Sequence, residues 1–348
     1  MMASLRPVLL LLSLAASSAA ASAQEPAAPK QALPPKSITL DVVVTPKSGR
    51  PVEGLEKSDF TLFDNKVPQA ITSFRAANSS DSPVEVLMVI DTVNINYTRL
   101  TYERQQIDNF LRSNGGHLAH PTSIAIFSDT GIQVQQGFST DGNQLSQTLK
   151  QAIIGLREIN ESAGFYGDED QIDLSLRALH SLVQREQALP GRKIMVWISP
   201  GWPYLSGPEI DLTNKQEEGL FQEVVGISRQ LREANVTLYA VNPRGAGQSV
   251  GWEFYYEEFL KGVTKPYQTQ LGNLALQVIA IQSGGLAFNA SNDTVGRLQQ
   301  CIDDTKSWYE ITYTPPKADR PDEYHQIEVK VDKPGLTAHT RTGYYDQP

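Results

Sequence analysis

Apolar residues follow two different spacings along this chain, and each spacing predicts a different kind of element. Five runs in the middle are almost continuously apolar, which is typical of strands covered on both faces of a parallel sheet. They are VEVLMVI from Val84, TSIAIF from Thr122, KIMVWIS from Lys193, VTLYAV from Val236 and the short LAF from Leu286. Between them, apolar residues recur every three or four positions, which predicts helices packed on the sheet. The clearest sets are Leu145, Leu149, Ile153 and Leu156, then Ile172, Leu176, Leu179 and Val183, then Leu220, Val224 and Leu231.

Both flanks change to an alternating pattern broken by Pro and Gly. SITLDVVVTP, DFTLFDN and AITSF precede the apolar runs, and YEITYTPP, HQIEVKV and TAHTRTGYY follow them. This alternation predicts antiparallel strands. Because three strands at either end are few for an independent core, we expect the two ends to pack together. The predicted fold is a doubly wound, mostly parallel α/β domain over residues 83–307, with a small β-sandwich formed by residues 37–77 and 308–345.

The first residues have the pattern of a secretory signal peptide. Arg6 precedes an apolar stretch from Val8 to Leu14, and Ala21-Ser22-Ala23 forms a small-residue cleavage site. We expect residues 1–23 to be removed near Ala23–Gln24 and residues 24–36, rich in Ala and Pro, to be a flexible leader. No other segment approaches the roughly 20 apolar residues of a membrane-spanning helix. The sequence therefore predicts a secreted or periplasmic protein without a membrane span.

Charge and cysteine content narrow the possible partners. The formal net charge of −9 disfavours nucleic acids and anionic membranes, because binding to both depends on clustered Lys and Arg. The single cysteine, Cys301, permits no internal disulfide. It shares a helical face with Leu298 and Ile302, so we expect a buried, unreactive side chain.

Polar side chains end several of the predicted sheet strands. Asp91 ends the first of them, Ser199 ends KIMVWIS and Asn242 follows VTLYAV. In open α/β sheets the ligand crevice lies outside the carboxyl ends of the strands. Oxygen ligands gathered there suit a hard cation such as Mg²⁺ or Ca²⁺. We therefore expect Asp91 to lie at a ligand-binding edge of the sheet.

The order of these features resembles a known family. The strand ending in Asp91, the covered parallel sheet and the signal peptide are similar to a von Willebrand factor type A domain. The flanks DVVVTPKSGRPVEGLEKSDFTLFDNKVPQAITSF and YEITYTPPKADRPDEYHQIEVKVDKPGLTAHTRTGYY resemble those of VWFA-related Acidobacterial domain proteins. The resemblance implies an exported binding or adhesion protein, and it implies a metal-ion-dependent adhesion site at the strand ends.

The metal-binding motif of that family is degenerate in this chain. The family's first strand ends in D-x-S-x-S, whereas here Asp91 is followed by Val93 and Ile95 at the two Ser positions. The third loop reads ISPGWP, with Ser199 and Pro200 where the family has Thr and Asp. Two hypotheses follow for this loop. In one, a weakly bound Mg²⁺ or Ca²⁺ is held by shifted oxygen ligands, which are Asp91, Asn94, Asn96, Asp168, Asp170 and Ser199. In the other, Asp91 caps the backbone of its own turn, and the two Asn residues adopt turn dihedrals.

A group of aromatic residues follows two of the sheet strands. GWPYLSGP and GWEFYYEEF place Trp202, Tyr204, Trp252 and Tyr255 near the same edge as Asp91. Aromatic side chains in loops over a rigid scaffold favour a partner-binding surface. The alternative is a helix that packs these rings inward.

The favoured function is therefore non-catalytic. We expect an exported protein that binds another protein or a cell-surface polymer through the strand ends. One alternative is a structural or envelope-assembly role that uses the edge strands of the β-sandwich. A hydrolase with Ser199 as nucleophile is less favoured, because Pro200 has no N–H to offer an oxyanion hole.

Overall fold

A computed structural model describes residues 36–47, 49–80, 82–95, 97–151, 165–202, 212–244 and 254–348, with the backbone alone for 97–99 and 165–169. The predicted signal peptide and leader lie outside the described residues. Residues Lys36–Pro348 belong to one compact unit.

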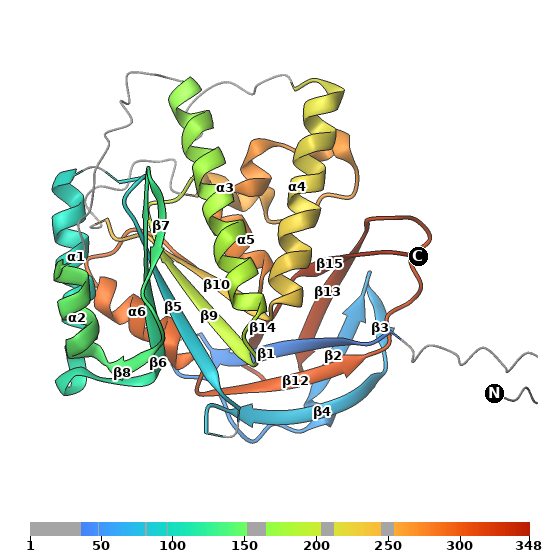
Figure 1. Cartoon of the computed structure of the whole chain (residues 1–348). Helices are drawn as coiled ribbons and strands as arrows, with labels where there is room; N and C mark the ends of the chain where they lie inside the picture. The colour runs from blue at the N-terminus through green and yellow to red at the C-terminus, as the bar shows by residue number, and fades with distance from the viewer. Residues whose placement is uncertain are drawn as a thin grey trace, which may run out of the picture. The chain divides into compact units, whose positions relative to one another are not determined.

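A seven-stranded sheet forms the centre of this unit, in the order β11-β10-β9-β5-β6-β7 with β8 beside β6 (Figure 1). The pairs from β11 to β6 are parallel, whereas β7 and β8 pair with β6 antiparallel. The strands are β5 (Val84–Asp91), β6 (His117–Ser128), β7 (Gly131–Val134), β8 (Ser139–Asp141), β9 (Arg192–Ile198), β10 (Val236–Val241) and β11 (Ala287–Phe288). The predicted mixed α/β fold with a parallel sheet is confirmed.

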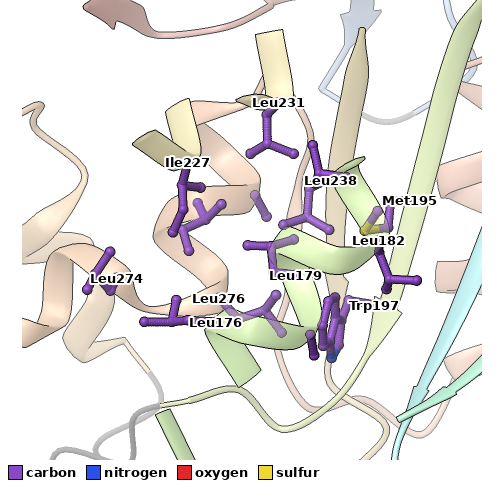
Figure 2. Close-up of a cluster of buried hydrophobic side chains, with 14 of the residues drawn as sticks. Leu176, Leu179, Leu182, Met195, Trp197, Ile227, Leu231, Leu238, Leu274 and Leu276 are labelled. Atoms are coloured by element: carbon purple, nitrogen blue, oxygen red, sulfur yellow. The ribbon is translucent and has the colours of Figure 1, made fainter. Parts of the chain in front are cut away.

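Helices cover both faces of this sheet because alternate residues of each strand point to opposite sides. On β9, Met195 and Trp197 pack in a cluster with helices α3, α4 and α5, whereas Ile194 and Val196 pack with α1, α2 and α6. Figure 2 shows part of the first cluster around Trp197. Cys301 is fully buried in the second, as expected. The helices are α1 (Tyr97–Leu111), α2 (Gly142–Gln151), α3 (Phe165–Gln187), α4 (Asn214–Glu233), α5 (Leu276–Gln282) and α6 (Thr294–Asp303).

The strands of the two chain ends pair with each other in two further sheets of four strands. One has the order β14-β1-β12-β4, in which strands from before and after the α/β region alternate, and the other has the order β15-β13-β2-β3, in which the C-terminal pair lies beside the N-terminal pair. Apolar side chains from both sheets share one buried cluster. The strands are β1 (Ile38–Pro46), β2 (Phe60–Asp64), β3 (Val67–Gln69), β4 (Ile71–Asn78), β12 (Ser307–Tyr313), β13 (Glu323–Val331), β14 (Leu336–His339) and β15 (Gly343–Asp346).

A buried carboxylate, Asp64 on β2, connects four strands of these end sheets. It accepts hydrogen bonds from Tyr313 Oη at 2.8 Å, Tyr344 Oη at 3.1 Å and His325 Nδ1 at 2.9 Å. The His325 ring also stacks on the Tyr344 ring, with centroids 4.9 Å apart. Burial alone lowers the pKa of His325, but the bond to Asp64 and its charge raise that pKa above its usual value. The contact with Asp64 therefore favours a protonated His325 and links the N-terminal and C-terminal flanks.

A second buried charge, Arg192 at the start of β9, links the central sheet to the end sheets. Its Nε lies 3.3 Å from Asp41 Oδ2 on β1, and its guanidinium carbon lies 4.7 Å from the Trp308 ring centroid on β12. Arg192 is only 4% exposed, so this ion pair is shielded from salt.

We expect Asp64→Asn to destabilise the fold by about 3–5 kcal/mol, because it removes one partner of a buried ion pair. Tyr313→Phe removes a single hydrogen bond to the same carboxylate and should cost only about 0.5–1.5 kcal/mol. Urea unfolding of both variants at neutral pH measures the difference. Equal losses in the free energy of unfolding for the two substitutions would show that the charge of Asp64 contributes no more than a single hydrogen bond.

Candidate functional site

The carboxyl rim, defined here as Asp91, Ser128, Ser199 and Asn242, lies where four neighbouring strands end. Asp91 and Ser128 are the last residues of β5 and β6, and Ser199 and Asn242 directly follow β9 and β10. Ser199 N donates to Val241 O at 3.0 Å, which keeps these two strand ends in register. The parallel pairing brings these polar residues to one edge of the sheet, as expected from the sequence.

The carboxylate of Asp91 is fully buried and saturated with N–H donors. Oδ1 accepts the backbone N–H groups of Val93 and Asn94, both at 2.9 Å. Oδ2 accepts the Asn94 side-chain amide at 2.8 Å and the Trp197 indole N–H at 3.1 Å. Burial raises the pKa of Asp91, although bonds from Asn94, Ser199 and Trp197 oppose that rise. Since a carboxylate offers about four acceptor positions, the four N–H donors together with Ser199 leave none of them open.

Asp91 caps the backbone of its own turn. Of the predicted ligands, Asn94 and Ser199 lie beside it. Asn94 points its amide at Asp91 and also donates to Ser175 Oγ on α3 at 3.0 Å. Asn96 and the side chain of Asp168 lie outside the described residues. The acidic loop expected at 168–170 is instead part of α3, where Asp170 is exposed.

The two apolar residues of the loop after Asp91 are core positions. Val93 and Ile95 are 7% and 9% exposed, and they pack into the two clusters on opposite faces of the central sheet. In the part of the chain that the structure describes, no group of three or more His, Cys, Asp or Glu is arranged to hold a metal ion. The loop after Asp91 is therefore anchored by apolar packing.

A second buried carboxylate, Glu103 on α1, was missed by the sequence reasoning. It is 0% exposed, and neither carboxyl oxygen has a hydrogen-bond partner among the described residues. Burial raises the pKa of Glu103 well above its usual value, and the charge of Asp91 raises it further. The signal was present in the sequence, because Glu103 falls three residues after Leu100 and four before Ile107, both buried on the same helix. Burial and the charge of Asp91 therefore both favour the neutral form of the Glu103 carboxyl group.

Ser199 is held inside the rim. Its hydroxyl is buried, accepts the Gly201 backbone N–H at 3.1 Å and contributes a hydrogen bond to Asp91. Helix α5 fixes the following residues, since Leu276 N donates to Trp202 O at 3.1 Å and Gln277 Nε2 donates to Pro200 O at 3.3 Å. This arrangement gives Ser199 a positioning role toward Asp91.

The aromatic residues after the strands do not form the predicted surface group. Trp202 is 1% exposed and packs edge-on against Trp197 with centroids 4.8 Å apart, so its assignment as a surface contact is wrong. Tyr204 and Trp252 lie outside the described residues, and Tyr255 is half-buried beside Tyr256. The exposed aromatic side chains in this region are instead Phe254, at 55%, and Tyr267, at 64%.

Comparisons with known proteins do not assign a family. No family model and no curated protein matches the chain. Among solved structures, manganese-loaded Plasmodium vivax TRAP is 10% identical over 77% of this chain and 96% of its own, with a TM-score of 0.34. The human COPII-coat protein Sec24c is 9% identical over 76% of this chain and 44% of its own (TM-score 0.34). The pilus adhesin SpaC from Lactobacillus rhamnosus GG, in its open conformation, is 10% identical over 82% of this chain and 47% of its own, with a TM-score of 0.38.

These similarities are too distant to support an argument about function. The chain spans about half or less of the length of Sec24c and SpaC. None of the described helices combines the length and apolar character needed to cross a bilayer.

We expect millimolar Mg²⁺ or Ca²⁺ to raise the melting temperature by less than about 1 °C, because N–H donors already fill the acceptor positions of Asp91. By contrast, a cation that binds only the folded state and is present at a hundred times its Kd would raise the free energy of unfolding by about 2.7 kcal/mol. Asp91→Ala should destabilise the turn equally with or without either ion. A large melting shift with an ion that disappears in Asp91→Ala would contradict this expectation.

Glu103→Gln should change how stability depends on pH. The pKa of Glu103 is raised in the folded state. Its contribution to folding stability is therefore fully present below the unfolded-state pKa and is lost as pH rises toward the folded-state pKa. Above roughly pH 4.5, the free energy of unfolding of the variant should therefore rise relative to that of the wild type, by up to about 1.4 kcal/mol per pH unit. Denaturant unfolding from pH 4 to 8 tests this, with the exposed Glu258→Gln as control. Parallel curves for wild type and Glu103→Gln would refute it.

Proposed function

We propose that this protein is an exported, non-catalytic binding or adhesion protein with a von Willebrand factor type A-like α/β domain. It recognises a protein or a cell-surface polymer through the segments around the carboxyl rim, without a bridging metal ion. The observation that carries the proposal is the saturation of Asp91 by four N–H donors. A carboxylate so engaged offers neither an open metal position nor a free base, so recognition depends on the surrounding surface.

The aromatic pair Phe254 and Tyr267 supplies the best contact surface in the described part of this region. Both lie in the connection between β10 and α5, which begins at the carboxyl rim. Lys265 Nζ lies 5.7 Å from the Tyr267 ring centroid, so the ring keeps a cation beside it. Exposed aromatic side chains provide large contact area for little loss of side-chain entropy and are enriched at protein interfaces. They replace Trp202 in the binding hypothesis.

A structural or envelope-assembly role remains the second candidate, and one observation favours it. Strand β4 is an eight-residue edge strand of its sheet, open on one side for pairing. A groove of ≈ 540 Å³ lies nearby, with Phe60, Leu62 and Ile71 among its lining residues. In this alternative, the end sheets act as a β-sandwich that receives an extended segment of a partner.

The hydrolase hypothesis has less support from the rim. Ser199 is 2% exposed, and its hydroxyl is committed to Gly201 N and Asp91. A nucleophile needs a base within hydrogen-bond reach and access to a substrate carbonyl. We therefore propose a binding role over a catalytic one.

We expect the double variant Phe254→Ser, Tyr267→Ser to lose at least about tenfold in partner capture, because removing an interface anchor typically costs more than 1 kcal/mol. The measurement is capture from a native envelope extract by immobilised protein, with and without chelator. Capture by the wild type should be insensitive to the chelator.

Val67→Ser is the matched control, since Val67 is 58% exposed but lies on β3 in the end sheets. Loss of capture in Val67→Ser, with none in the aromatic double variant, would favour the end sheets as the contact surface. Loss of wild-type capture on adding chelator would overturn the metal-free mode of binding.

A further inference from the structure

Strand β4 is the one long edge strand of the described sheets. It has eight residues, and its neighbour among the described residues is β12, on one side only (Figure 1). The other edge strands, β3, β7, β11, β14 and β15, have only two to four residues each. Half of the β4 residues are exposed, namely Thr72, Ser73, Arg75 and Ala76. The outer side of β4 therefore offers a row of backbone N–H and C=O groups to a further strand.

Most of β4 lacks the usual protections of an exposed edge. Strand β3, which precedes it in the chain, carries Pro68, and a proline has no N–H to offer a further strand. Strand β4 contains no proline, and its pairing with β12 is irregular only before Ser73. Its single charged residue is Arg75, whose guanidinium binds both carboxylate oxygens of Glu310 on β12 and donates to Ser82 Oγ at 3.0 Å. The charge of Arg75 is therefore paired within its own chain and does not guard the edge.

The two faces of β4 restrict how another strand can pair with it. Phe74 packs against the core that the end sheets share, and its ring centroid lies 5.5 Å from that of Phe60. Ser73 and Arg75 lie on either side of Phe74 in the sequence and therefore on the opposite face, where Arg75 binds Glu310. A slip of one residue in the pairing would exchange the two faces. An added strand must therefore place an apolar residue beside Phe74 and polar residues beside its neighbours.

A second copy of β4 meets this requirement in an antiparallel pair centred on Phe74. In that register, Phe74 lies opposite Phe74 of the second copy, and Ser73 lies opposite Arg75 of the second copy. Aromatic pairs are favourable across neighbouring strands, and no two like charges lie directly opposite each other. A pair centred on Arg75 would instead place two guanidinium groups opposite each other, which is unfavourable. The sequence of β4 is therefore complementary to itself in the Phe74-centred register.

We infer that two copies of this chain associate through antiparallel pairing of their β4 strands in the Phe74-centred register. The sheet β14-β1-β12-β4 of each copy then continues into that of the other across a two-fold axis. The groove of ≈ 540 Å³ includes Ile71, the first residue of β4, so apolar surface continues beside the paired strands. This interface belongs to the end sheets, and the inference does not depend on the proposed partner binding around the carboxyl rim.

The test is sedimentation equilibrium of the purified protein over a range of concentrations. Pairing of one strand buries less than the roughly 1,000 Å² of a stable interface, so we expect a reversible dimer with a Kd of about 10–100 µM. Ser73→Lys places a like charge opposite Arg75 of the second copy, twice by symmetry, and should raise this Kd at least about tenfold. Ser73→Glu places an opposite charge there and should lower the Kd about fivefold. Ser73 is exposed, so both variants should keep the fold of the monomer.

Thr337→Lys is the matched control, since Thr337 is exposed on β14, the opposite edge strand of the same sheet. It adds the same charge away from β4 and should leave the Kd of the dimer unchanged. A wild-type protein that stays monomeric at millimolar concentration, or a dimer that Ser73→Lys does not weaken, would overturn the β4 interface. The same conclusion would follow if Thr337→Lys weakened the dimer as much as Ser73→Lys. Equal weakening by Ser73→Lys and Ser73→Glu would overturn the Phe74-centred register.

Discussion

A carboxylate buried at the end of a strand must have its charge balanced, and this requirement shapes the carboxyl rim. Asp91 closes β5, which is buried on both faces of the sheet, so water cannot solvate its oxygens. The balancing donors come from its own turn and from Trp197 on the neighbouring β9. Asn94 extends the network to Ser175 on α3. The turn conformation, the β5–β9 pairing and the position of α3 are therefore coupled through one side chain.

The stabilisation of Asp91 by hydrogen-bond dipoles has a consequence for the next carboxyl group. N–H dipoles stabilise the charge of Asp91 locally, but they do not cancel it at a distance as a divalent ion would. The remaining negative potential acts on Glu103, which burial already favours in its neutral form. Val93 and Ile95 hold the same loop by apolar packing on the two faces of the sheet. The loop is therefore anchored by packing, while the charge of Asp91 favours the neutral form of a carboxyl group on α1.

Local patterns predicted the elements well, and contacts between elements account for what they missed. The continuous apolar runs correspond to β5, β6, β9 and β10, and the position of Asp91 at a strand end follows from where its run stops. The role of Trp197 depends on the register that places it beside β5, which no spacing within its own strand reveals. Trp202 looked like a loop aromatic because Gly and Pro surround it, yet packing against Trp197 buries it. TAHTRTGYY reads as one strand, but its two halves, β14 and β15, belong to different sheets.

Two polar pairs join the flanks of the chain to each other and to the central sheet. Each end sheet mixes strands from both flanks, so the flanks must be joined across polar as well as apolar contacts. Asp64 with His325 and Asp41 with Arg192 are matched pairs at two of these junctions.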